Sequence, residues 1–238
     1  MTLEHVHIHE VESEHQEGKQ ELWVMVPDSL DTSKTYRVLY LLPIGPGRMT
    51  PGEERFGNEL DELPKLDPCN KYDVIVCRPS FAKAPWFRDP KQIAYVKDVV
   101  VPTIETLYPT LGTPEGRLLM GYSKGGSGSF KMILQHPDFF GYAASWDGNM
   151  HVDELKKAIR DNPGSLGPFT KEIRLVLAGG EDNYWQKVVV QYHEVLKDAG
   201  VLHHYDDTQA FAHAWSVKWM APTLEALMKL RTNAPQTK

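Results

Sequence analysis

The sequence has only two cysteines and contains neither a long apolar run nor a block of like charge. Cys69 and Cys77 flank a predicted strand in C-N-K-Y-D-V-I-V-C, where a stabilising disulfide is rare, so a reducing compartment fits. No apolar stretch approaches the roughly 18 residues that a membrane helix needs. The first ten residues, M-T-L-E-H-V-H-I-H-E, do not resemble a secretory signal, although a chain cut after a leader would look the same. We therefore expect a cytoplasmic protein.

The charges also exclude several classes of partner. The chain has 26 basic and 32 acidic side chains, a net charge of −6, spread along its length. This argues against nucleic acid or an anionic membrane as a partner and favours a small, neutral substrate. No G-x-x-x-x-G-K-[ST] pattern for a phosphate-binding loop is present. The charge pattern says nothing about the oligomeric state.

No metal or cofactor is expected. His5, His7 and His9 alternate along a predicted strand, which places them on one face. No acidic or cysteine ligand set accompanies them, so an exposed strand face is favoured over a metal site.

The order of apolar segments predicts one α/β domain spanning residues 1–238, because no linker interrupts the chain. Two amphipathic strands are followed by buried strands that alternate with helices, a pattern typical of a mostly parallel sheet with antiparallel strands at its N-terminal edge and helices on both faces. Strands are predicted at 5–12, 21–26, 36–42, 72–77, 118–121, 141–146, 173–178 and 201–205. Helices are predicted at 53–63, 91–108 with a bend at Pro102, 130–134, 152–160, around 189–196 and around 217–227.

The segment L-L-M-G-Y-S-K-G-G-S-G, from Leu118 to Gly128, contains a G-x-S-x-G motif centred on Ser123. Apolar residues precede it and a helical run follows, which is the strand, sharp turn and helix of a nucleophile elbow. The glycines allow neighbouring backbone to pass close to the turn. We predict Ser123 to be a nucleophile.

A serine hydroxyl needs a base, and the base needs an acid that orients it. Asp182 directly follows a predicted strand, and His213 lies in the loop Q-A-F-A-H-A-W before the last helix, so Ser123, Asp182 and His213 follow the chain order typical of α/β hydrolases. Alternatives remain for the two partners of the serine. For the acid they are Glu181 and Asp147, and for the base His136, His203 and His204.

The oxyanion of an acyl transfer requires two backbone donors. The N–H of Lys124, the residue after the nucleophile, is one candidate. The other comes from the loop after the strand at 36–42. Pro43 and Pro46 have no N–H, so Ile44 or Gly45 is predicted, with Ile44 slightly favoured.

Four segments together resemble a known family: V-L-Y-L-L, G-Y-S-K-G-G, H-P-D-F-F-G-Y-A-A-S-W-D-G and the late A-H-A-W. They are similar to the esterase family related to esterase D, feruloyl esterases and antigen 85-type acyltransferases, over about residues 21–230. The resemblance implies an α/β-hydrolase fold and a serine carboxylesterase with Ser123, Asp182 and His213 as its triad. Many members have H-G-G-G where this chain has P-I-G-P-G at 43–47, so the oxyanion loop differs. An acyltransferase, or a binding module with weak catalysis, are the alternatives.

The segment 147–170 is too short for the lid that many lipases insert, so an open cleft is predicted, with a preference for small soluble esters of short-chain or aryl acids. Aromatic residues in loops at the same edge of the sheet suit such substrates. Those predicted to contact the substrate are Phe81, Trp86, Phe87, Tyr184, Trp185 and Trp215.

Overall fold

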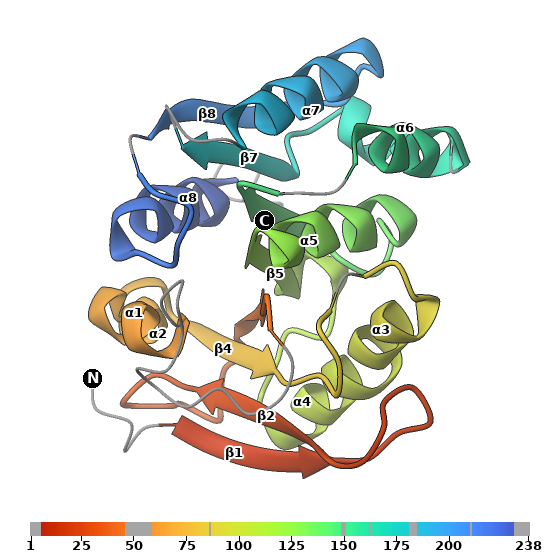
Figure 1. Ribbon diagram of the computed structural model, residues 1–238. Helices are drawn as coiled ribbons and strands as arrows, with labels where there is room; N and C mark the ends of the chain where they lie inside the picture. Colours follow the sequence, from red (N-terminus) through yellow and green to blue (C-terminus); the bar gives the residue numbers. More distant parts are fainter. Residues whose placement is uncertain are drawn as a thin grey trace.

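The computed structural model describes residues 6–45, 59–85, 87–148, 151–161, 163–180, 185–209 and 211–230. Eight strands form one sheet in the order β1-β2-β4-β3-β5-β6-β7-β8 (Figure 1). Their bounds are β1 Val6–Val11, β2 Gln20–Met25, β3 Arg37–Leu42, β4 Val74–Pro79, β5 Arg117–Tyr122, β6 Tyr142–Trp146, β7 Leu175–Gly180 and β8 His203–Gln209.

The two N-terminal strands pair antiparallel, β1 with β2 and β2 with β4, and every other pairing in the sheet is parallel. The predicted mostly parallel sheet with antiparallel edge strands is therefore confirmed. The carboxyl ends of β3, β5, β6, β7 and β8 lie at one edge, which is where loops build sites in such sheets.

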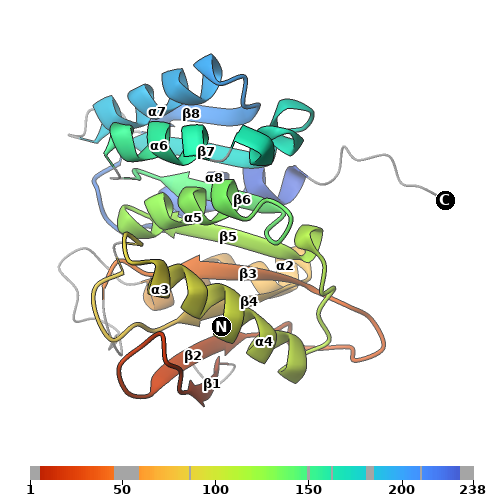
Figure 2. The ribbon, with the colours of Figure 1, turned by 90° about the vertical axis from the view of Figure 1, so that its right-hand side faces the viewer.

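Helices cover both faces of the sheet (Figure 2). On one face lie α1 Glu59–Glu62, α2 Pro68–Tyr72 and α8 Val217–Lys229. On the other lie α3 Pro90–Ala94, α4 Val101–Leu107, α5 Lys124–Gln135, α6 Val152–Asp161 and α7 Gln186–Asp198. Short 3-10 helices are Leu63–Leu66, Pro114–Gly116, Pro163–Leu166 and Pro168–Thr170. Central strands such as β3 are apolar throughout because side chains on both of their faces are covered.

The helix predicted at 91–108 forms, and its irregularity lies just before Pro102. A π-helical segment, Tyr95–Val100, joins α3 to α4. Pro102 occupies the first turn of α4, where its missing N–H costs little. No helix in the described ranges combines the length and the apolar character that crossing a bilayer requires.

Candidate active site

Ser123 lies in a strained turn between β5 and α5. Its backbone has φ 53° and ψ −118°, outside the regions that L-residues ordinarily populate. The adjacent glycines are required by space: a Cβ on Gly121 would lie 2.2 Å from the carbonyl carbon of Gly125, and a Cβ on Gly125 would lie 2.1 Å from the Leu42 carbonyl oxygen. The motif therefore forms the predicted strand, turn and helix, and presses the start of α5 against the end of β3.

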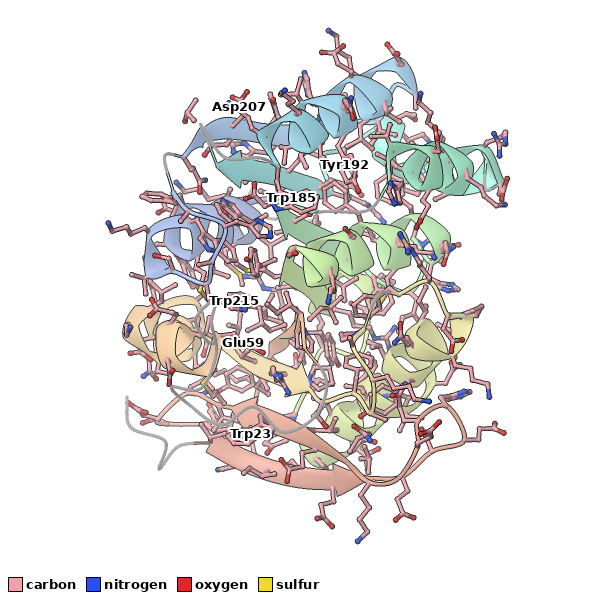
Figure 3. The ribbon with its side chains drawn as sticks, viewed as in Figure 1. Trp23, Glu59, Trp185, Tyr192, Asp207 and Trp215 are labelled. Carbon is pink, nitrogen blue, oxygen red and sulfur yellow. The ribbon has the colours of Figure 1, made fainter. Side chains whose placement is uncertain are left out.

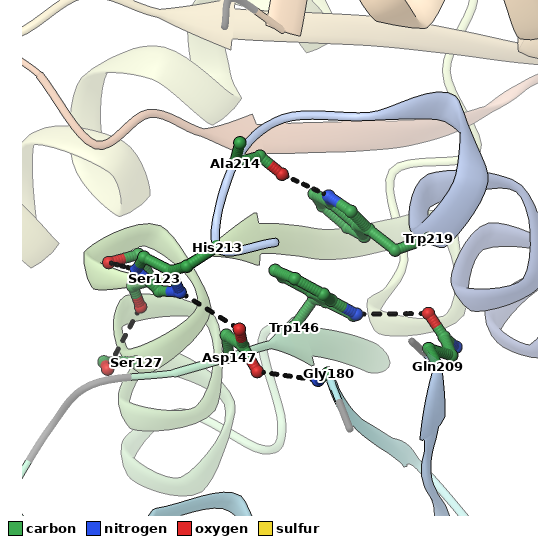
Figure 4. A network of polar contacts seen from close by, with 9 residues as sticks. All are labelled: Ser123, Ser127, Trp146, Asp147, Gly180, Gln209, His213, Ala214 and Trp219. Atoms are coloured by element: carbon green, nitrogen blue, oxygen red, sulfur yellow. Dashed lines mark hydrogen bonds and ion pairs between the residues drawn. The ribbon is translucent and has the colours of Figure 1, made fainter. Parts of the chain in front are cut away.

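His213 lies between β8 and α8 and connects the serine to a carboxylate (Figure 4). Its Nε2 is 3.2 Å from Ser123 Oγ, and its Nδ1 is 3.0 Å from Asp147 Oδ2. Ser123 is 6% exposed, the Asp147 side chain is fully buried, and the His213 side chain is 20% exposed. The imidazole is thus partly exposed, while the carboxylate is excluded from water.

Asp147 follows β6 directly and is fixed from several sides. Its backbone adopts φ 45°, and its N–H donates to the Ala178 carbonyl oxygen at 3.0 Å. Its second carboxylate oxygen, Oδ1, accepts from the Gly180 N–H at 3.0 Å. The end of β7 therefore orients the carboxylate that contacts His213. Sequence reasoning missed this role of Gly180, because a backbone donor leaves no signature beyond the G-G pair.

The preferred acid of the sequence analysis, Asp182, lies outside the described residues, as does Glu181. In the structure the partner of His213 Nδ1 is Asp147, which was the alternative. A neutral imidazole that accepts a proton at Nε2 carries its one N–H at Nδ1. The Asp147 carboxylate accepts the hydrogen bond from that N–H. This contact favours Asp147, the alternative of the sequence analysis, as the acid, while the prediction for Asp182 falls outside the described residues.

The alternative histidines are not near the serine. His203 contacts His193 and the Val201 carbonyl oxygen, each at 2.8 Å, and His204 is exposed on β8. His136 ends α5. Only His213, among the described histidines, contacts Ser123.

Aromatic rings surround the His213 imidazole. The ring centroids of Tyr122, Trp185 and Trp146 lie 4.6, 5.3 and 6.3 Å from that of His213. Trp146 is itself held by its Nε1–H, which donates to Gln209 Oε1 at 3.1 Å (Figure 4). Trp185 is half-buried and lies next to the end of β7, as Figure 3 shows, so it is the predicted aromatic residue that the structure places at the histidine.

Three of the predicted substrate contacts are wrong, because the residues are covered by the core. Phe81 and Phe87 are fully buried and pack edge to face, with centroids 5.5 Å apart. The Phe87 ring occupies the space over Gly128, where a Cβ would lie 2.4 Å from it. Trp215 is 4% exposed and packs against Tyr122. Trp86 and Tyr184 lie outside the described residues.

The two predicted oxyanion segments are in contact. Lys124 is the first residue of α5, where backbone N–H groups have no partner within the helix. Ile44 and Gly45 follow β3 and are half-buried. Lys124 Nζ lies 3.5 Å from the Ile44 carbonyl oxygen, and burial lowers the pKa of the Lys124 ammonium. The rest of the loop, from Pro46, lies outside the described residues.

A serine hydroxyl, an imidazole and a buried carboxylate thus form one line of contacts, with the start of α5 beside the serine, and this arrangement is compatible with acyl transfer. Within the described ranges, no group of three or more His, Cys, Asp or Glu side chains is arranged to hold a metal ion.

Comparisons with known proteins bear on the family and on the fold. The sequence model of the family described as "Putative esterase" matches residues 70–187. The chain is 24% identical to the uncharacterized protein YbbA of Bacillus subtilis (strain 168), over 79% of this chain and 82% of that protein. The match to the esterase family supports an esterase, and hence a hydrolase.

Solved structures share the fold. A ferulic acid esterase superposes with a TM-score of 0.73 at 18% identity, covering 95% of this chain and 97% of that one. An S-formylglutathione hydrolase from Staphylococcus aureus superposes with a TM-score of 0.66 at 15% identity, covering 94% and 98%. The chain thus has the α/β-hydrolase fold, and it matches the "Putative esterase" family that its motifs resemble.

Proposed function

We propose that the protein is a serine esterase that forms an acyl-enzyme on Ser123. The observation that carries this proposal is the line of contacts from Ser123 Oγ through His213 to the buried Asp147 carboxylate. A serine hydroxyl packed for structural reasons alone requires neither the strained backbone of Ser123 nor a histidine whose other nitrogen meets a carboxylate.

In the first half-reaction His213 Nε2 takes the proton of Ser123 Oγ as that oxygen attacks the ester carbonyl carbon. The N–H groups of Lys124 and Ile44 are the proposed donors to the oxyanion. Asp147, fixed by Gly180, supports the positive charge on the imidazolium. The tetrahedral intermediate then collapses, the bond to the alkoxy oxygen breaks, and Nε2–H protonates the leaving alcohol.

In the second half-reaction the same base acts on water. His213 Nε2 takes a proton from the water as its oxygen attacks the acyl carbon, and then returns that proton to Ser123 Oγ as the acid leaves. The sum of the two half-reactions is ester plus water giving acid plus alcohol. No other reactant is required.

We propose small, soluble esters of short-chain or aryl acids as substrates. The described residues between β6 and β7 hold only α6 and two 3-10 helices, and no segment there is long enough for a separate lid. Trp185, half-buried beside His213, supplies an aromatic surface for an aryl group. The fold is shared with enzymes named as a ferulic acid esterase and an S-formylglutathione hydrolase, which agrees with a small acyl donor.

The test is hydrolysis of p-nitrophenyl acetate by wild type, Ser123→Ala and the control Ser129→Ala. Ser129 is buried on α5, the helix that follows Ser123, and its hydroxyl donates to the Gly125 carbonyl oxygen. We expect Ser123→Ala to lose about a thousand-fold or more in kcat, and Ser129→Ala to stay within a few-fold of wild type. Equal rates in wild type and Ser123→Ala would contradict the proposed esterase and favour a binding module.

A further inference from the structure

A basic cavity of about 300 Å³ lies between α3 with its π-helical extension and the C-terminal end of α5. Arg88, Lys97, Lys131 and His136 line it, together with apolar side chains, and none of its lining residues is acidic. The chain as a whole has a net charge of −6, so this grouping of cationic side chains runs against the overall charge. A cavity of this composition favours an anion that also has an apolar part.

The cavity is separate from the serine site. Lys131 is eight positions after Ser123, which corresponds to roughly 12 Å along a helix at 1.5 Å per residue. Its lining residues come from α3 and the loop before it, from the π-helical segment, and from the C-terminal half of α5 with His136 directly after it, whereas His213 and Asp147 come from the loops after β8 and β6. A molecule bound there therefore does not touch the reacting atoms.

Two of the three cationic side chains, Arg88 and Lys97, have carboxylate partners at the rim. Arg88 Nε is 3.0 Å from Glu154 Oε1, and Lys97 pairs with Asp98. Both pairs are partly exposed and hence screened. Lys131 differs: its Nζ donates to the Phe87 carbonyl oxygen at 2.7 Å, and no carboxylate of the described residues forms an ion pair with it. Burial lowers the pKa of its ammonium, which an anionic ligand would offset.

Two neutral polar groups adjoin this lysine. Gln135 and His136 both line the cavity and are half-buried. Burial and the Lys97 charge lower the pKa of the His136 imidazole, so the ring is neutral at pH 7 and presents one N–H. One ammonium, one amide and one neutral imidazole match the charge and the acceptors of a carboxylate.

We propose that this cavity binds a small aromatic monocarboxylate, with the carboxylate at Lys131, Gln135 and His136 and the ring against Ile93 and Ala94. Ile93 is 5% exposed and Ala94 is half-buried, and both supply apolar lining to the cavity. A volume of about 300 Å³ accommodates one substituted ring and is at the lower end of small-molecule sites. This ligand site is independent of the proposed esterase chemistry.

Sodium benzoate is the probe, titrated by calorimetry into the full chain carrying Ser123→Ala. Benzyl alcohol, which keeps the ring and lacks the charge, is the ligand control. We expect saturable binding of benzoate in roughly the millimolar range or tighter, and binding of benzyl alcohol at least about tenfold weaker. Absence of saturation up to about 10 mM, or equal binding of the two ligands, would overturn the proposal.

Lys131→Met, made in the same Ser123→Ala chain, tests the location because it removes the charge and keeps an unbranched side chain. Lys91→Met is its matched control, since Lys91 lies on α3, is exposed and does not line this cavity. We expect a loss of about tenfold or more for Lys131→Met and no change for Lys91→Met. Lys131 also donates a hydrogen bond to the Phe87 carbonyl oxygen, so its substitution can affect the fold. Gln135→Leu therefore serves as a second variant, and thermal melting verifies that both variants are folded. Undiminished binding in folded Lys131→Met and Gln135→Leu proteins would place the benzoate elsewhere and contradict the proposal.

Discussion

The His213 imidazole contacts Asp147, which follows β6, at a distance of 3.0 Å between Nδ1 and Oδ2. The carboxylate is fully buried, and its other oxygen accepts the Gly180 N–H at the end of β7. A buried carboxylate is costly unless each oxygen has a partner, and here both oxygens have one. The carboxylate that contacts His213 is therefore supplied by the turn after β6 and oriented by the end of β7.

This relationship ranks two substitutions. Asp147→Asn should lower kcat by about a thousand-fold or more, because the amide in place of the carboxylate favours the wrong imidazole tautomer and no longer supports the imidazolium. Asp182→Asn should cost far less. The measurement is p-nitrophenyl acetate turnover of both purified variants, with circular dichroism as the control for folding. The opposite ranking would return the acid to Asp182.

The second prediction concerns the base. His213→Ala should reduce kcat by about a thousand-fold or more while the fold is retained, because no other described histidine contacts the serine. His204→Ala is the matched control, since His204 is an exposed residue of β8 and should be silent. Turnover of His213→Ala within a few-fold of wild type would move the base elsewhere.

The third prediction tests the packing of the nucleophile elbow. In Gly125→Ala the new methyl group would lie 2.1 Å from the Leu42 carbonyl oxygen, so either β3 or α5 must shift. We expect turnover to fall by at least about a hundred-fold and the melting temperature to drop, since small displacements in an active site are costly. Gly164→Ala, where nothing lies within 4 Å of the added atom, should change neither quantity. A Gly125→Ala protein with wild-type turnover would contradict the close approach of the two segments.

The fourth prediction concerns a buried ion pair. Arg78 Nε lies 2.7 Å from Glu59 Oε1, and the two side chains are 1% and 0% exposed. The pair joins α1 to the end of β4, beside which Figure 3 shows Glu59. Glu59→Ala should lower the free energy of unfolding by about 3–5 kcal/mol, because it leaves a buried guanidinium without its carboxylate.

The control for that prediction is Glu10→Ala, which breaks an exposed ion pair with Lys19. The Lys19 side chain is 61% exposed and the Glu10 side chain is 60% exposed. We expect a loss of less than about 1 kcal/mol there. Urea denaturation measures both values. Equal losses of unfolding free energy in the two variants would show that the buried Arg78–Glu59 pair stabilises the fold no more than the exposed pair does.

The fifth prediction is a chain-length profile. With no separate lid in the described segment between β6 and β7, activity on p-nitrophenyl esters should be greatest for short acyl chains. The rate should show no jump at the micelle threshold. A maximum at long acyl chains accompanied by such a jump would contradict the open cleft.

Local sequence patterns were sufficient to predict much of the site. The apolar run predicts β3, and the glycines around Ser123 predict the sharp turn after β5, because these constraints act within a few residues. His213 was predictable from its position between the last strand and the last helix. The choice between Asp147 and Asp182 was not, because it depends on the turn after β6 and on a donor from β7, both of which are tertiary features.

The aromatic residues show the same limit. Phe81 and Phe87 follow the carboxyl end of the buried strand β4. Their prediction as substrate contacts depended on this position alone. In the structure that loop folds against α5, where Gly128 leaves room for the Phe87 ring. The sequence does not reveal which face of α5 meets which loop, so their burial could not be predicted.

The proposed acyl-enzyme on Ser123 is tested most directly by trapping this covalent intermediate. Wild-type protein is mixed with p-nitrophenyl acetate, quenched in acid during the first turnovers, digested and mapped by mass spectrometry. We expect one acetyl group on the peptide that contains Ser123, at Ser123 itself, and none at that peptide in Asp147→Asn after the same short reaction time. Full turnover with no acetyl group on Ser123, or acetylation of another residue that matches the turnover rate, would contradict it.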